Sequence, residues 1–109
     1  MNINLKFTNL EPTTSIEAYA DMKFRMLEKI LTHLDPEGTA DLHVELAYTT
    51  RHHQKGNVYE VSAKLHIPGK DFQVSETEEE LYAGIDVAKD TLWRALEKFK
   101  DLKADKRGR

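Results

Sequence analysis

The residues best suited by type to form a reactive or binding site lie in the segment RHHQKGNVYEV, residues 51–61. There, two adjacent histidines and two basic side chains precede an alternating apolar segment. Three kinds of site use such residues: a metal centre, a catalytic loop, or a turn that contacts phosphate. Neighbouring side chains of an extended backbone point to opposite sides, so His52 and His53 cannot readily share one metal ion. The segment is therefore predicted to be a hairpin turn, in which Gly56 and Asn57 tolerate positive φ angles.

A metal site elsewhere in the chain would need histidine and carboxylate ligands, because the sequence contains no cysteine. Compatible residues are expected on one polar face of a sheet: His43, Glu45, Glu60 and His66. A bound metal needs three or four converging ligands, however, and the sequence shows only that these side chains share a face. Exposed polar sheet positions are the favoured interpretation, so we expect no metal and no other cofactor.

Enzymatic chemistry has equally little support in the sequence. The chain has no nucleophile elbow, no phosphate-cradling glycine loop and no HExxH helix. We therefore expect a protein that binds rather than catalyses, and that has no small-molecule substrate.

Composition predicts the class of protein. A length of 109 residues, with 39% hydrophobic and 32% charged, predicts one folded domain. The sequence has no run of about 18 apolar residues and no charged-then-apolar leader, which predicts a cytoplasmic protein without a membrane partner. The net charge of −3 argues against a general nucleic-acid binder, but this average hides a basic end. The basic residues of that end are Lys98, Lys100, Lys103, Lys106, Arg107 and Arg109.

The hydrophobic pattern predicts the strands that must position these residues. Apolar residues alternate with polar ones in residues 2–8, 42–48 and 59–67. A shorter alternation follows at Phe72 and Val74, after a tight turn. Each of these segments is typical of a strand with one buried face, so four strands are expected.

Two amphipathic helices are expected between and after the strands. Apolar residues recur at spacings of three and four over residues 16–34, before the breaker DPEG, which predicts one continuous helix. A second such stripe predicts a helix over about residues 78–103, and Thr77 and Glu80 have the spacing of a capping box at its start.

Together these elements predict an α+β fold of the order β-α-β-β-β-α. Two helices are expected to pack on one face of a four-stranded mixed sheet. The first crossover should be right-handed and should make the strands at 2–8 and 42–48 parallel neighbours. We expect the domain to span residues 1–103 and residues 104–109 to form a flexible basic tail.

The segments NINLKFTNLEPT, TTRHHQKGNVYEV and IPGKDFQVSETEEELYAGIDVAKDTLWRALEKFK resemble the ribosome hibernation-promoting factor and ribosome-associated inhibitor A family. The likeness extends over almost the whole chain, to Lys100, and the predicted order of elements agrees with it. It implies a translation inhibitor that binds the small ribosomal subunit at the decoding region. There it would occupy the path of messenger and transfer RNA and hold ribosomes inactive under stress. Long members add a C-terminal dimerising domain, so this chain resembles the short type.

The resemblance also implies where ribosomal RNA is bound. Lysine and arginine attract phosphate, and folded RNA can be bound through its backbone without base-specific contacts. Some relatives have basic residues where this chain has Glu17, Met26 and Thr91, so part of that surface is missing here. The resemblance implies contacts to ribosomal RNA from Lys23, Arg94, Lys98 and Lys100, and Arg51, Lys55 and Lys70 at two predicted turns are expected to compensate for the missing part. The full set of predicted contacts also includes Arg25 and Lys89.

Two alternatives stay open for individual residues. Arg94 and Lys98 share a flank of the last predicted helix, where they could instead pair with Asp90 and Asp101 as ordinary solvated charges. An aromatic side chain on the opposite flank, such as Trp93, could stack on a base. For Trp93, as for its neighbour on the same stripe, Tyr82, a place at the margin of the core is the favoured interpretation.

An alternative also stays open for the function. The same fold could serve as a general double-stranded-RNA-binding module or as a module that modulates a transcription factor. The sequence does not decide whether a helper protein for ribosome dimerisation is a further partner, or whether only single ribosomes are blocked.

Overall fold

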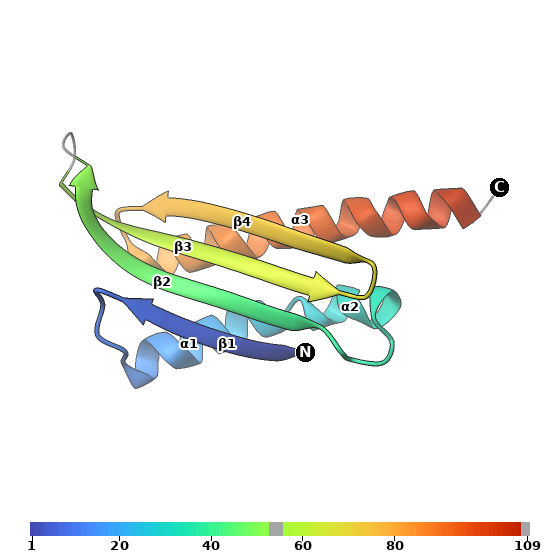
Figure 1. Ribbon diagram of the computed structural model, residues 1–109, viewed down its shortest axis with the longest axis horizontal. Helices are drawn as coiled ribbons and strands as arrows, with labels where there is room; N and C mark the ends of the chain where they lie inside the picture. The colour runs from blue at the N-terminus through green and yellow to red at the C-terminus, as the bar shows by residue number, and fades with distance from the viewer. Residues whose placement is uncertain (53–55, 108–109) are drawn as a thin grey trace.

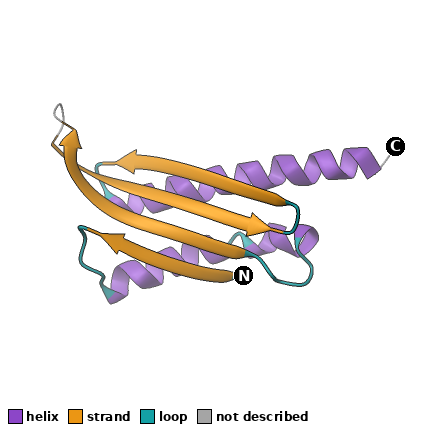
Figure 2. Cartoon of the chain, viewed as in Figure 1, coloured by secondary structure: helices purple, strands orange, loops and turns teal. Residues whose placement is uncertain are grey.

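The computed structural model describes residues 1–52 and 56–107, except for the side chains of residues 50–52, 56–57 and 105–107 (Figure 1). Its elements are β1 (Asn2–Thr8), α1 (Thr14–Arg25), α2 (Glu28–Leu34), β2 (Asp41–His52), β3 (Gly56–Ile67), β4 (Lys70–Glu78) and α3 (Leu81–Arg107). All helices lie on one face of the sheet (Figure 2). This arrangement confirms the predicted α+β fold.

The sheet has the strand order β1-β2-β3-β4, in which β1 and β2 are parallel and the other pairs are antiparallel. A mixed sheet with a parallel first pair was expected from the helical crossover, and it is confirmed. The register pairs Leu42 with Leu65 and Val44 with Ala63. These side chains are buried, so the predicted inward face of both strands is correct.

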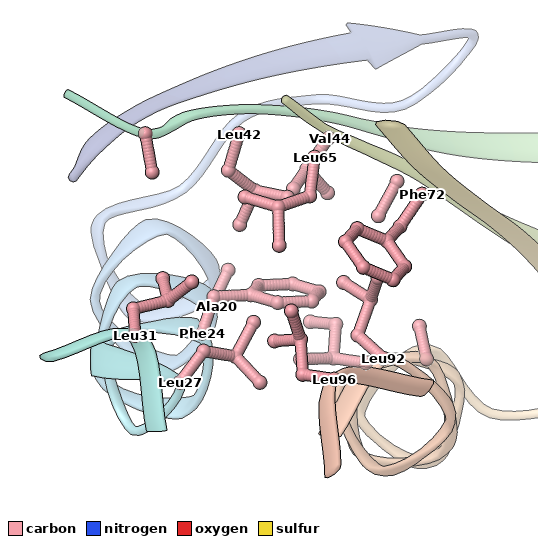
Figure 3. Close-up of a cluster of buried hydrophobic side chains, with 14 of the residues drawn as sticks. Ala20, Phe24, Leu27, Leu31, Leu42, Val44, Leu65, Phe72, Leu92 and Leu96 are labelled. Carbon is pink, nitrogen blue, oxygen red and sulfur yellow. The ribbon is translucent and has the colours of Figure 1, made fainter. Parts of the chain in front are cut away.

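One hydrophobic core lies between the sheet and the helices (Figure 3). Phe24 of α1, Leu92 and Leu96 of α3, and Leu42 of β2 have no exposed surface. Burial of one such side chain contributes about 1.5–3 kcal/mol to folding, so this stripe fixes the rotation of α3 about its own axis. The residues on the outer side of α3 are consequently held toward solvent.

The first helix differs from the prediction, because the segment forms two helices rather than one. At the junction, the Met26 N–H donates to the Lys23 carbonyl at 3.2 Å and the Leu27 N–H donates to the Phe24 carbonyl at 3.0 Å. These bonds span three residues instead of four and tighten the backbone locally. The junction keeps Leu27 fully buried, so the apolar stripe continues from α1 into α2 although the helix is divided.

The start of the last helix also differs from the prediction. Thr77 pairs with Glu60 in the sheet, so the proposed capping box is wrong and the helix begins at Leu81. Glu80 caps it instead, because its Oε1 accepts the Ala83 N–H at 3.2 Å. The helix continues to Arg107, a few residues past the expected end. The flexibility of residues 104–109 stays a prediction.

A buried carboxylate closes the turn between α2 and β2. The two oxygens of Asp35 accept hydrogen bonds from the Thr39 hydroxyl at 2.9 Å and from the Ala40 N–H at 2.7 Å. Burial by itself raises the pKa of Asp35, but these hydrogen bonds outweigh it and lower the pKa below the usual value. Asp35 is therefore a structural anion that sets where β2 begins.

Candidate nucleic-acid interface

Lys23, predicted to contact RNA, is held between two helices. Its Nζ lies 3.3 Å from Asp86 Oδ1 of α3 and 5.8 Å from the centre of the Tyr19 ring. The Tyr19 hydroxyl donates to the same carboxylate at 2.6 Å, and this hydrogen bond, with burial and nearby negative charge, raises the pKa of Tyr19 to about 12. Lys23 is thus already paired, and only 23% of its side chain is exposed.

Arg25 serves the fold rather than a free basic surface. Its Nε donates to Asp21 Oδ1 at 3.2 Å, and its Nη1 donates to Glu28 Oε2 at 3.3 Å and to the Met1 carbonyl at 3.1 Å. The N-terminal ammonium lies 3.4 Å from the same Glu28 oxygen. Arg25 therefore ties the chain start to α1 and α2 across the helix junction.

Lys89 is neutralised by its neighbour on α3. Its Nζ lies 2.8 Å from Asp90 Oδ1, and 12% of the Lys89 side chain is exposed. The hydrogen bond from Lys89 lowers the pKa of Asp90 despite some desolvation, which favours the ionised Asp90 carboxylate. A lysine held in this way offers little charge to an incoming phosphate.

Arg94 and Lys98 are exposed, and the salt bridges found among the described residues include neither of them. Neither residue forms a salt bridge with Asp90 or Asp101, although the nearby charge of Arg94 contributes to the lowered pKa of Asp90. Arg94 Nη2 donates a long hydrogen bond, at 3.5 Å, to the Thr91 hydroxyl. Together with Glu97, Asp101 and Leu102, the two basic residues line a shallow hollow on the outer side of α3.

Lys70 and Lys100 also lack a carboxylate partner among the described side chains. Lys70 starts β4 and is exposed, while Lys100 is half-buried on α3. The remaining two predicted contacts are Arg51 and Lys55. Arg51 belongs to β2, but its side chain is outside the described part of the chain, as is the whole of Lys55.

The two aromatic residues on the other flank of α3 lie at the margin of the core. Trp93 is partly buried and packs against the core cluster. Tyr82 is half-buried, and its ring meets the Tyr19 ring edge-on at a centroid distance of 4.7 Å. This placement agrees with the favoured interpretation of both residues.

The open face of the sheet carries the histidines that were considered for metal binding. His66 Nδ1 contacts Asp71 Oδ1, and Glu45 accepts a hydrogen bond from the Thr8 hydroxyl at 2.6 Å. His43 lines one hollow with Glu45 and a second with His66 and Asp71. Within residues 1–52 and 56–107, no group of three or more histidine and acidic side chains could hold a metal ion.

Comparison with known proteins identifies the family. The sequence matches the family described as sigma 54 modulation protein and S30EA ribosomal protein over residues 3–103. The chain belongs to this family. The family predicted from the sequence motifs is thus confirmed. No match was found among curated proteins.

Two solved structures share the fold of this S30EA family member. The N-terminal domain of Protein Y from Thermus thermophilus is 27% identical, with a TM-score of 0.74, and the match covers 91% of this chain and 99% of that domain. A ribosomal subunit interface protein from Coxiella burnetii is 14% identical, with a TM-score of 0.74, and the match covers 93% of this chain and 99% of the other. At 14% identity, this second likeness shows the fold alone.

Charge is distributed unevenly along this S30EA chain. Glu76, Glu78, Glu79 and Glu80 cluster where β4 ends and α3 begins, whereas the C-terminal half of α3 carries basic residues. Lys103 belongs to this basic half and was missing from the predicted contacts. The sequence signal that could have pointed to Lys103 is its position four residues after Phe99, because side chains four apart on a helix are neighbours.

Among the helices that the structure describes, none has the length and apolar character needed to cross a membrane.

Proposed function

We propose that this protein binds the small ribosomal subunit in the cytoplasm, at the decoding region, and blocks the path of messenger and transfer RNA so that stressed ribosomes stay inactive. One observation carries the proposal: residues 3–103 match the S30EA ribosomal protein family. The unpaired basic side chains of α3 support it, because they can bind the phosphates of a ribosomal RNA backbone. The proposed ribosome-binding domain is residues 1–103.

Inhibition by occupancy needs no catalytic group. A folded domain that fills the path of messenger and transfer RNA excludes them sterically, so its effect depends only on affinity and position. Arg94 can present two parallel donors to one phosphate, and Lys98 adds a point charge four residues away. Recognition of folded RNA by shape and backbone is consistent with this small set of contacts.

The net charge of −3 is compatible with RNA binding because the unpaired positive charges lie together on one part of the molecule. Carboxylates neutralise Lys23, Arg25 and Lys89 internally. Other basic side chains remain unpaired on or beside the C-terminal half of α3: Lys70, Arg94, Lys98, Lys100 and Lys103. We propose that these five residues supply the phosphate contacts.

The proposal is tested by co-sedimentation with purified small ribosomal subunits over a salt series. About five phosphate contacts should give a slope of log affinity against log salt of about −3 to −5. At fixed free magnesium, a chelator selective for transition metals should leave binding unchanged. Binding that does not respond to salt, or no binding to small subunits, would contradict the proposal.

A second candidate function has one observation in its favour, because the family description also includes sigma 54 modulation. A module that acts on a transcription factor, or on double-stranded RNA in general, would share this fold. Competition separates the candidates: an unlabelled RNA duplex in large excess should not displace the protein from small subunits. Displacement by the duplex at equal concentration would favour general RNA binding.

A further inference from the structure

Phe99 lies at the centre of a small cluster formed by α3 and the start of β4. Its ring meets the Phe72 ring edge-on, with centroids 5.7 Å apart. Lys103 Nζ lies 5.5 Å from the centre of the Phe99 ring, and Lys70 Nζ lies 6.0 Å from the same centre. Lys70 is also 5.8 Å from the Phe72 ring. Two ammonium groups from different elements therefore converge on one aromatic ring.

The two lysines keep their charge available. Both are exposed, and neither takes part in a salt bridge of the described residues. The carboxylate next to Lys70 in the chain, that of Asp71, contacts His66 instead. An aromatic ring attracts an ammonium group without cancelling its charge, so the cluster holds the lysines in place and leaves them positive.

Holding the lysines in place favours binding of an anion. A free lysine loses rotamer freedom when it contacts a ligand, which weakens the complex. Contact with Phe99 removes part of that freedom before a ligand arrives. The packing of Phe99 against Phe72, which is only 8% exposed, fixes the ring that does this.

The cluster lies on another flank of α3 from the outer basic pair. Lys103 lies five positions after Lys98, and at about 100° per residue their side chains point about 140° apart around the helix. Lys103 therefore points to the side of Phe99 and Lys70, while Arg94 and Lys98 face the outside. The C-terminal half of α3 can thus meet phosphates on both flanks.

We propose that Lys70 and Lys103, held by Phe99, form a phosphate-binding pair that grips the backbone of folded RNA on the flank of α3 opposite Arg94 and Lys98. This inference rests on the proposed function and specifies that two of its five basic residues act as a separate pair, held by an aromatic ring. The ligand is a pair of backbone phosphates, because two ammonium groups match phosphate oxygens. Phe99 positions the lysines and does not stack on a base, since its ring is already engaged by Phe72 and both ammonium groups.

The test measures binding of the full chain to purified small ribosomal subunits over a salt series. The double variant Lys70→Ala/Lys103→Ala should lower the magnitude of the salt slope by about 2, and each single variant by about 1. A matched control is Lys6→Ala/Lys64→Ala, which makes the same charge change on the open face of the sheet. This control should keep the wild-type slope.

Phe99→Leu separates positioning from charge. It keeps both lysines but removes the ring that holds them, so affinity should fall by about fivefold while the salt slope stays near the wild-type value. A thermal unfolding curve checks that this variant is folded. If it does not fold, the lysine variants still decide the question, because both substituted side chains are exposed.

The outcomes distinguish this inference from the proposed function. If the wild-type chain does not bind small subunits, both are refuted. If it binds and the double lysine variant has wild-type affinity and slope, the phosphate-binding pair is refuted and Lys70 and Lys103 drop out of the proposed contacts, while binding to the small subunit stands. Titration with inorganic phosphate provides a last arm: saturable binding that the double variant loses would show a small-anion site and overturn the assignment to an RNA backbone.

Discussion

The outer basic pair of α3 offers the sharpest test of the proposed function. In the variant Arg94→Glu/Lys98→Glu, attraction at two neighbouring phosphates becomes repulsion. The fold should survive, because both side chains are exposed and the hydrogen bond of Arg94 to Thr91, at 3.5 Å, is long. Exposed changes of this kind alter stability by about 0.5 kcal/mol or less.

The expected loss of affinity follows from the number of unpaired basic residues. With five phosphate contacts, wild-type affinity should fall by about 100–500-fold between 50 and 200 mM salt. With three contacts left, the fall over the same range should be about 20–40-fold. If the two lines converge near 1 M salt, the variant should bind about 25–60-fold more weakly than wild type at 0.1 M, before any repulsion is added.

Two assays check this prediction: co-sedimentation with small ribosomal subunits, and inhibition of translation in a reconstituted system. The charge of the whole molecule changes as well, so a control must carry the same change elsewhere. Lys6→Glu/Lys64→Glu provides it on the open face of the sheet, away from α3. A folded Arg94→Glu/Lys98→Glu protein that still inhibits translation at the wild-type concentration would refute the placement of the site on this flank.

Three further predictions concern the structure that supports this surface. Asp86→Asn should lower the Tyr19 pKa from about 12 toward 10, as followed by tyrosinate absorbance. Because the pKa of Tyr19 is raised in the folded protein, the stability that its hydrogen bond to Asp86 contributes is complete below pH 10 and is lost between about pH 10 and 12. An unchanged pKa would contradict the role of the Asp86 carboxylate. Because the pKa of Asp35 is lowered in the folded protein, its contribution to folding stability is present above the ordinary pKa of 3.8 and is lost as the pH falls below that value. Asp35→Asn should therefore flatten the acid side of a plot of stability against pH, and should cost about 1–3 kcal/mol at pH 7. An acid side as steep as in wild type would count against this. In Gly84→Ala the new Cβ would lie 2.9 Å from Val61 Cγ2. The cost of this crowding, about 1–3 kcal/mol, should exceed the gain in helix propensity of about 1 kcal/mol, so the Tm should fall. A raised Tm would show that Val61 moves freely.

Several features of the fold could be predicted from the sequence because their causes are local. Alternation with a period of two assigns each strand residue to one face, and burial of that face sets the register. Leu42, Val44 and Leu65 therefore lie where the pattern placed them. The helical stripe ending in Leu96 likewise shows which side of α3 is buried, and hence that Arg94 is exposed.

The boundaries of the helices were decided by packing across the fold. The junction between α1 and α2 contains no proline or glycine, so periodicity alone predicts a continuous helix. Thr77 and Glu80 have capping-box spacing, but pairing of Thr77 with Glu60 extends β4 past the expected helix start. A capping-box spacing stabilises a helix start only locally, so it does not set the boundary where the same residues can form backbone hydrogen bonds across a sheet.

For Lys23 and Lys70, availability for binding was decided by the tertiary structure, whereas Arg25 and Lys89 are neutralised by carboxylates nearby in the sequence. The sequence identifies every lysine and arginine, but ion pairs form according to distance in space. Asp86, which engages Lys23, also joins to Tyr19 across 67 residues of sequence. In the same way, only folding brings Lys70 to the ring of Phe99. Composition therefore determined how much positive charge the chain carries, and three-dimensional proximity decided which charges are neutralised and which remain for a partner.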